Sequence, residues 1–325
     1  MISQANPGGE IFSLKGKRVW VAGHNGLVGS ALVHRLEQEE CTILKVSHGE
    51  LDLTRQADTE RWMAKSRPEV VLVAAAKVGG IAANSAYPAD FLYINAMIAM
   101  NIMKAATDIG TEKLLWMGSS CIYPKFAAQP IDEHALLTGP LEPTNEPYAI
   151  AKIAALKLAQ AYAAQYGTRS ISVMPTNLYG RNDNFDPQGS HVIPAMVRKM
   201  HEAKVADSET VTVWGTGNPL REFLHVDDLA DACILLMKTH THLQLINVGS
   251  GQEVSIRDLA YLVADIVGYR GQIVFDTSKP DGTPRKRLNS LRLHALGWTP
   301  KVDLRSGIED LYHHWRQRAG QVAAE

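Results

Sequence analysis

Short apolar runs alternate with longer amphipathic stretches through the first half of the chain. The apolar runs are rich in β-branched residues, which is typical of strands buried on both faces. We expect strands at residues 18–22, 42–46, 70–76, 114–118 and 170–175. Helical periodicity marks the stretches between them, and we expect helices at residues 27–39, 57–66, 89–109 and 147–166, the last ending at Gly167. This alternation indicates βαβ units and predicts an α/β fold with a doubly wound parallel Rossmann sheet.

The pattern loosens after residue 180, where Pro and Gly are scattered among shorter elements. We therefore expect residues 17–180 to form the Rossmann domain. Residues 181–325 are expected to form mainly a smaller C-terminal substrate-binding lobe that covers the ligand crevice. Segments near residues 223–249 are expected to return to the first domain, and residues 1–16 to form a loose N-terminal leader.

Composition and charge exclude several classes of function. The 325 residues, 46% of them hydrophobic and 21% charged, suffice for one large core or two modest ones. Lys and Arg (33) nearly balance Asp and Glu (34), so we expect no binding to nucleic acid or to an anionic membrane. No apolar run of about 18 residues could span a bilayer, and the first residues lack the apolar core of a signal peptide. The cysteines are widely spaced, which predicts no metal site and a reducing cytoplasm.

A glycine-rich GxxGxxG loop directly follows the first expected strand and opens the first helix. Glycines there let the backbone turn tightly and approach a pyrophosphate, whose charge is met by free N–H groups of the helix. A glycine triplet alone is often an ordinary turn, but its place after a strand favours dinucleotide binding. The loop residues expected to contact the cofactor are Gly23, Asn25, Gly26, Leu27, Val28 and Gly29.

The end of the second expected strand should distinguish NAD from NADP. An acid at this point would hold a ribose 2′-hydroxyl, whereas a base would hold a 2′-phosphate. No acid ends the strand, and the basic residue His48 is near, so NADP(H) is favoured. Asp52 is expected to contact the adenine side or to act as N-cap of the next helix, and Leu53 is the third cofactor-binding candidate here.

Tyr148 and Lys152 lie four residues apart in an expected helix, so both side chains share one face. A free tyrosine has a pKa of about 10, but a neighbouring ammonium and a helix N-terminus favour its phenolate. Such a pair is often only part of a helix surface. Ser119 strengthens the catalytic interpretation, because it follows a central strand at the sheet edge where ligands bind and can share a proton with Tyr148.

Taken together, the glycine loop, Ser119, Tyr148 and Lys152 resemble the extended short-chain dehydrogenase/reductase superfamily that acts on nucleotide sugars. Within it, longer segments resemble the GDP-L-fucose synthase family, and the similarity extends from about residue 17 to residue 315. These segments are residues 74–80, 118–124, 142–148, 175–180, 183–185, 214–217 and 278–286. The resemblance implies an NADPH-dependent enzyme that converts GDP-4-keto-6-deoxy-D-mannose to GDP-L-fucose by 3,5-epimerisation and reduction at C4.

The resemblance also implies roles for individual residues. Ser119, Tyr148 and Lys152 would carry out the reduction, while Cys121 and His191 would move protons at C3 and C5. Cofactor contacts beyond the glycine loop would include Ser119, Ser120, Tyr148, Lys152, Pro175, Asn177, Leu178 and His191. Contacts to the GDP-sugar would come from Lys199, Trp214, Arg221 and Asp281. The family often has arginines where this chain has Asn25 and His48. We therefore expect this chain to prefer NADPH over NADH by a smaller margin than relatives that carry those arginines.

Elementary chemistry agrees with these roles but leaves simpler explanations open. Epimerisation needs a base near the ring, and hydride delivery needs an acid at the keto oxygen, so two proton-transfer devices must share one pocket. Cys121 would point the same way as Ser119 on an extended strand end, yet it could also be a buried apolar residue. His191 could be an exposed loop residue, and Arg221 could form a surface ion pair with Glu222 instead of holding a diphosphate.

Two other functions remain possible on the same scaffold. One is a different nucleotide-sugar epimerase or reductase, or a 4,6-dehydratase, although the dehydratases carry an Asp-Glu pair where Ser120 and Cys121 stand here. The other is a non-catalytic module that senses NADP, which would not need the acid Tyr148 at the hydride site. The alanine-rich helices at 89–109 and 149–164 have spare apolar faces, from which we expect a homodimer with a four-helix contact.

Overall fold

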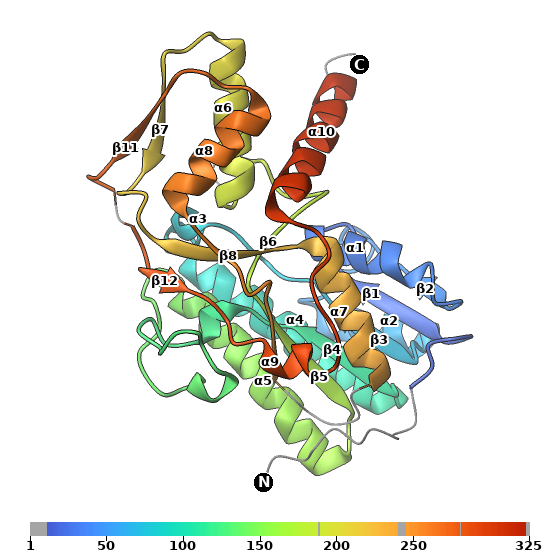
Figure 1. The fold of residues 1–325 in the computed structure, drawn as a ribbon. Coiled ribbons are helices and arrows are strands. Elements are labelled where there is room, and N and C mark those ends of the chain that lie inside the picture. Colours follow the sequence, from blue (N-terminus) through green and yellow to red (C-terminus); the bar gives the residue numbers. More distant parts are fainter. Residues whose placement is uncertain (1–11, 188, 240–244, 280, 323–325) are drawn as a thin grey trace.

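The computed structural model describes residues 12–322 except 188, 240–244 and 280. Its largest feature is a six-stranded parallel sheet with the order β2-β1-β3-β4-β5-β9 (Figure 1). The strands are β1 (Arg18–Ala22), β2 (Thr42–Leu44), β3 (Val70–Val73), β4 (Lys113–Met117), β5 (Ser170–Pro175) and β9 (Leu245–Val248). Every residue of β3, β4 and β5 is buried, as expected of strands covered on both faces. The predicted α/β Rossmann fold is confirmed.

Helices cover both faces of this sheet. On one face, α1 (Leu27–Leu36) packs against α7 (Val226–Thr239). On the other, α4 (Pro88–Ile109) packs against both α2 (Gln56–Ser66) and α5 (Glu146–Tyr166). Successive residues of β1 alternate between the two apolar clusters that fill these layers, as the pleat of a strand requires.

A second group of elements has an apolar cluster of its own and lies apart from the large sheet (Figure 1). β7 (Thr210–Trp214) and β11 (Gln272–Asp276) form a two-stranded parallel sheet. α6 (Val192–Val205) packs against β7, and α8 (Ile256–Val267) contacts both α6 and α10 (Leu304–Val322).

A small sheet built around β8 and several short elements complete the fold. Its strands are β6 (Asn177–Tyr179), β8 (Leu220–His225), β10 (Glu253–Ser255) and β12 (Arg285–Lys286), and β8 pairs with each of the other three. The short helices are α3 (Ile81–Ala86), α9 (Leu291–His294), and the one-turn 3₁₀ helices η1 (Ser120–Ile122) and η2 (Glu133–Ala135).

Element boundaries differ from the predicted ones mainly at carboxyl ends. β2 ends at Leu44 rather than at residue 46, and β3 ends at Val73 rather than at residue 76. Beyond β3 the amide of Ala74 still donates to the Ala22 carbonyl at 3.0 Å, after which the chain leaves the sheet and becomes a loop. Helix α5 ends at Gly167, whose φ of 70° is the left-handed conformation expected of a C-cap.

Residues 12–16 are packed, although we expected them to be part of a loose leader. The Phe12 amide donates to the Lys238 carbonyl at 2.9 Å, and Leu14 is only 1% exposed. The rest of that expected leader, residues 1–11, lies outside the described residues. Strand β9 and helix α7 pack with the first sheet although both follow residue 180 in sequence. The division into domains at that residue stays a prediction.

Candidate active site

A single large cavity of about 1180 Å³ collects almost all of the candidate residues. One wall consists of loops that follow β1, β3, β4 and β5, at the carboxyl edge of the Rossmann sheet. The opposite wall includes residues of α6, β7 and the segment around β12. In parallel sheets this edge is where ligands bind, so the fold itself places the chemistry here.

The glycine loop forms one end of the cavity and has the geometry of a pyrophosphate cradle. Gly23 has a φ of 84°, and a Cβ at this position would lie 2.7 Å from backbone atoms of Ala75. A Cβ on Gly29 would lie 2.0 Å from the Gly23 carbonyl oxygen. Helix α1 begins directly after Gly26, its N-cap, and no side chain caps it. The first N–H groups of α1 are therefore left for an anion, and the residues present fit a bound dinucleotide.

The segment after β2 lines the neighbouring part of the cavity. His48, Asp52 and Leu53 all contribute to the wall, as does Asn25 of the glycine loop. The Asp52 carboxylate accepts hydrogen bonds from the Thr54 amide at 2.9 Å and hydroxyl at 2.7 Å, which lower its pKa. The N-cap of α2 is residue 55, so the expectation that Asp52 might cap this helix is wrong.

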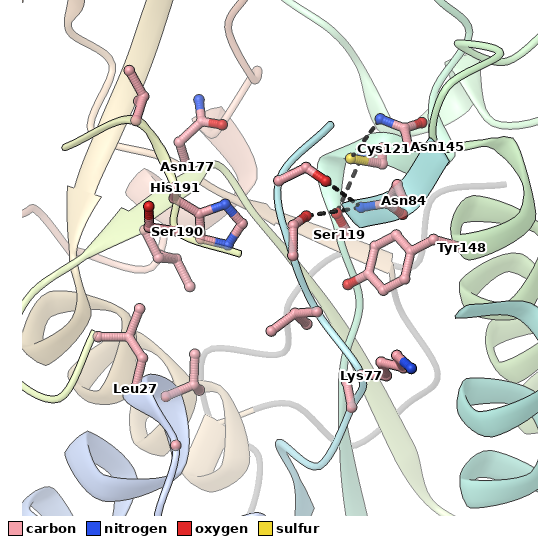
Figure 2. A pocket seen from close by; sticks show the side chains of 18 of the residues that line it. Leu27, Lys77, Asn84, Ser119, Cys121, Asn145, Tyr148, Asn177, Ser190 and His191 are labelled. Atoms are coloured by element: carbon pink, nitrogen blue, oxygen red, sulfur yellow. Dashed lines mark hydrogen bonds between the residues drawn. The ribbon is translucent and has the colours of Figure 1, made fainter. Parts of the chain in front are cut away.

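Ser119, Tyr148 and Lys152 all line the cavity (Figure 2 shows Ser119 and Tyr148). Tyr148 and Lys152 are one turn apart on α5, and Lys152 Nζ lies 5.7 Å from the centre of the Tyr148 ring. Lys152 Nζ also donates to the Met117 carbonyl at 2.9 Å. Only Gly118 separates Ser119 from the end of β4, so the position of Ser119 depends on the last strand residues.

The ionisation of these groups differs from the sequence-based expectation. Burial raises the pKa of Tyr148 above its ordinary value, and this effect exceeds the lowering by the hydrogen bond with Ser119. Burial also lowers the pKa of Lys152 to about 8. The predicted stabilisation of a phenolate is therefore wrong. Tyr148 is a neutral phenol, which is the form that donates a proton.

Cys121 reaches the same pocket by a different route from the one we expected. The strand has already ended, and Cys121 lies in the 3₁₀ turn η1, whose N-cap Ser119 accepts a hydrogen bond from the Cys121 amide at 3.2 Å. Two nitrogens approach its sulfur: Asn145 Nδ2 at 3.5 Å (Figure 2) and Lys286 Nζ at 3.4 Å. Neither Asn145 nor Lys286 was among the site residues expected from sequence. Both lie in segments that resemble the family, which is the only signal that could have pointed to them.

His191 lies on the other side of the pocket from Cys121 and Tyr148 (Figure 2). It is the N-cap residue of α6 and lines the cavity, and the protein around it lowers the pKa of the imidazole by desolvation. Asn177 lies on the same side and donates from Nδ2 to the Glu222 carbonyl at 2.8 Å. Three other expected cofactor contacts, Ser120, Pro175 and Leu178, also line the cavity.

Another part of the cavity wall combines an aromatic surface with basic groups. Trp214 is 57% exposed, and the ammonium groups of Lys199 and Lys279 lie 5.9 and 5.6 Å from the centre of its ring. Arg221 donates to the Asp281 carbonyl at 3.4 Å, and its pKa is lowered by desolvation. Trp214, Lys199 and Arg221 together provide stacking area and positive charge.

Glu222 and Asp281 use their carboxylates within the protein. Glu222 is fully buried and accepts from the amides of Gly251 at 2.7 Å and Leu288 at 2.9 Å. The alternative in which it forms a surface ion pair with the preceding arginine is therefore wrong. The Asp281 carboxylate accepts from the Thr216 amide at 2.7 Å and hydroxyl at 2.8 Å, which ties two loops of the cavity wall together.

In the part of the chain that the structure describes, no three or more His, Cys, Asp and Glu side chains gather so that they could hold a metal ion. Nor does any helix in this part combine the length and the apolar character needed to cross a membrane.

Comparison with known proteins agrees with this geometry. A model of the NAD dependent epimerase/dehydratase family matches residues 19–249. GDP-L-fucose synthase 1 of Arabidopsis thaliana is 58% identical over 308 residues, which cover 94% of this chain and 95% of that protein. The GDP-L-fucose synthase of Escherichia coli K12 is 52% identical over 306 residues, covering 91% and 95%. Among solved structures, a GDP-L-fucose synthetase from Naegleria fowleri bound to NADP has a TM-score of 0.88 and 27% identity, and the match covers 96% of this chain and 98% of that one. The chain belongs to the NAD dependent epimerase/dehydratase family and, within it, to the GDP-L-fucose synthases.

Proposed function

We propose that this enzyme converts GDP-4-keto-6-deoxy-D-mannose to GDP-L-fucose, by epimerisation at C3 and C5 followed by NADPH-dependent reduction at C4. The observation that carries the proposal is the presence of two proton-transfer devices in one cavity. Tyr148 with Ser119 and Lys152 is one, and Cys121 with His191 across the pocket is the other. A plain reductase needs only the first device, and a redox sensor needs neither.

NADP(H) is the proposed cofactor, and it supplies the hydride for C4. The glycine cradle supports pyrophosphate binding at the start of α1, because Gly23 and Gly29 leave no room for side chains. Asn25 and His48 would lie near the adenosine ribose, where an imidazole and an amide bind a 2′-phosphate more weakly than the bidentate guanidinium of an arginine does. Residues 17–180, with later segments such as β9, are proposed to form the cofactor-binding domain, and residues 181–325 mainly the substrate-binding lobe.

Cys121 and His191 are proposed to carry out the epimerisation from opposite faces of the sugar. A carbon next to the C4 ketone loses its proton to a base, and the enolate that results regains a proton on the other face. The sulfur of Cys121 can accept the first proton as a thiolate. His191 can donate the second, because an imidazole titrates near neutral pH and its lowered pKa makes the imidazolium a stronger acid.

Tyr148 is proposed to donate a proton to the C4 oxygen as the hydride arrives. Its raised pKa keeps the phenol protonated until negative charge develops on that oxygen. Ser119 would hydrogen-bond the same oxygen, and Lys152, fixed to a main-chain carbonyl, would stabilise the charge that passes to Tyr148.

The basic end of the cavity is proposed to hold GDP. Trp214 offers an exposed ring on which a base can stack, and Lys199 and Arg221 can neutralise the diphosphate. Asp281 would support this subsite indirectly, since its carboxylate is taken by Thr216.

We also propose a cytoplasmic homodimer. The three cysteines are free thiols in the structure. Helices α4 and α5 pack side by side and expose Leu92, Met100 and Ile150, which a second copy would cover in a four-helix contact. Light scattering should report a dimer, and Met100→Glu should shift it toward a monomer.

The direct test is incubation of the purified protein with NADPH and a panel of nucleotide-linked 4-keto-sugars, with each product identified by NMR. Consumption of NADPH with the GDP-linked 4-keto-6-deoxyhexose, and formation of the L-fucose configuration, is the expected result. Reduction without inversion at C3 and C5 would point to a plain reductase, and no consumption with any sugar would point to a cofactor sensor.

A further inference from the structure

Two nitrogen donors converge on the sulfur of Cys121. Lys286 Nζ lies 3.4 Å from it, and Asn145 Nδ2 lies 3.5 Å from it. A neutral thiol is a weak acceptor, whereas a thiolate is strongly attracted to an ammonium and to an amide N–H. Both donors come from segments that are distant along the chain, β12 and the residue before α5. A cysteine used only for packing would not need two such donors at its sulfur.

The other charged or titratable groups around Cys121 are engaged elsewhere. Glu142 accepts hydrogen bonds from its own loop, and Lys152 donates to a main-chain carbonyl. Burial raises the pKa of Tyr148 and so keeps it neutral. Among the residues described by the structure, no carboxylate forms an ion pair with Lys286. The ammonium of Lys286 is therefore the positive charge available to the sulfur.

The segment that carries Lys286 is held on both sides. Arg285 forms a bidentate ion pair with Glu253, with distances of 2.7 and 2.5 Å. The Leu288 amide donates to the fully buried Glu222 at 2.9 Å, and β12 pairs with β8. Because this backbone is fixed in advance, the ammonium approaches the sulfur without ordering a mobile loop.

We propose that Lys286, assisted by Asn145, is a positioning residue that holds Cys121 as a thiolate and so creates the base for epimerisation. This rests on the proposed function of Cys121. In the step concerned, the sulfur lone pair forms an S–H bond with the C3 or C5 proton. The electron pair of the broken C–H bond moves into the ring to give the enolate. Lys286 keeps its proton throughout, and the Cys121 thiol later releases its proton to water.

The first test measures the thiolate itself. The full-length protein is alkylated with iodoacetamide over a range of pH, and modification of Cys121 and Cys41 is quantified separately by mass spectrometry. Lys286→Met should raise the pH of half-maximal alkylation at Cys121 by about one unit and slow the reaction roughly tenfold at neutral pH. Lys286→Arg should stay close to the native protein. Cys41, whose sulfur donates to a main-chain carbonyl, is the internal standard and should not change.

A matched lysine variant and a second readout separate this role from others. Lys125 lies four residues after Cys121. In the Lys125→Met variant, the alkylation of Cys121 should match that of the native protein. Deuterium exchange at C3 and C5 of the keto-sugar should fall roughly tenfold in Lys286→Met at neutral pH and recover at higher pH, where the thiol ionises unaided.

Two outcomes would count against different parts of the account. An unchanged alkylation profile in Lys286→Met, with only a raised KM for the sugar nucleotide, would overturn the inference and leave Lys286 as a diphosphate ligand. The alkylation of Cys121 could instead depend on Lys286 while the native protein exchanges no deuterium into the sugar. That result would uphold the effect of the Lys286 ammonium on the Cys121 sulfur and refute the proposed epimerisation.

Discussion

Removal of the Tyr148 hydroxyl should separate the reduction from every other step. Tyr148→Phe deletes one oxygen and leaves the ring, which keeps its edge contact with Phe91 at a centroid distance of 6.2 Å. The fold and the cofactor cradle should therefore be unaffected. The substitution removes the proton donor for the C4 oxygen. The raised pKa of the Tyr148 phenol keeps this proton bound until negative charge develops on that oxygen in the transition state.

The size of the effect follows from this role. Positioned general acids accelerate reactions by about 10²–10⁴-fold, which corresponds to about 3–5 kcal/mol of activation free energy. Because the donor acts in the transition state, kcat should fall by this factor while the Kd for NADPH stays within about twofold. Epimerisation uses the other device, so deuterium exchange at C3 and C5 should persist in Tyr148→Phe.

The assay follows NADPH absorbance at saturating keto-sugar, with NADPH affinity measured by fluorescence titration. Tyr162→Phe is the matched control, because Tyr162 lies on the same helix and packs against Tyr166 away from the cavity. Turnover of Tyr148→Phe within a few-fold of the native enzyme would refute the assignment of Tyr148 as the acid.

Five further substitutions test other parts of the structure. Asn25→Arg should widen the preference for NADPH over NADH, and equal kcat/KM values for the two cofactors in the native enzyme would refute any preference. Gly29→Ala should weaken NADPH binding at least tenfold in a calorimetric titration, because the new Cβ would lie 2.0 Å from a main-chain oxygen of the loop. Cys121→Ser should lose most deuterium exchange while retaining NADPH binding, and His191→Ala should impair epimerisation less, since water can replace the acid. Lys113 is 2% exposed, and burial lowers the pKa of its ammonium from 10.5 to about 8. Between pH 8 and pH 10.5 this side chain is therefore protonated in the unfolded chain but largely neutral in the folded protein. Native stability should therefore gain about 3 kcal/mol from this group as pH rises from 8 to 10.5, and Lys113→Met should show a flatter profile in urea denaturation.

The large sheet could be predicted because its signals are local. Strands β3, β4 and β5 are buried on both faces, so each of them stands out in the sequence as a continuous run of mostly apolar residues. The glycine loop and the Tyr148–Lys152 pair are equally local, since their spacing fixes a turn and a helix face. The position of Ser119 followed from its place just after a strand of that sheet.

The rest of the site depends on contacts between distant segments. Lys286 meets Cys121 across 165 residues of sequence, and no periodicity predicts such a meeting. The orientation of Cys121 was attributed to an extended strand, whereas a 3₁₀ turn capped by Ser119 sets it. The role of Asp281 in closing a loop onto Thr216 also could not be predicted, and its expected contact with the substrate stays a prediction. Burial reverses the expected direction of the Tyr148 pKa, and burial is a property of the folded pocket.

The central claim is that one cavity both inverts two carbons and reduces a third. The measurement that tests it most directly is a reaction of the native enzyme with NADPH and GDP-4-keto-6-deoxy-D-mannose in deuterated water, followed by NMR of the product. The account predicts GDP-L-fucose with deuterium at C3 and C5 and with hydrogen from NADPH at C4. A reduced sugar that keeps protium and the D-manno configuration at C3 and C5 would contradict it.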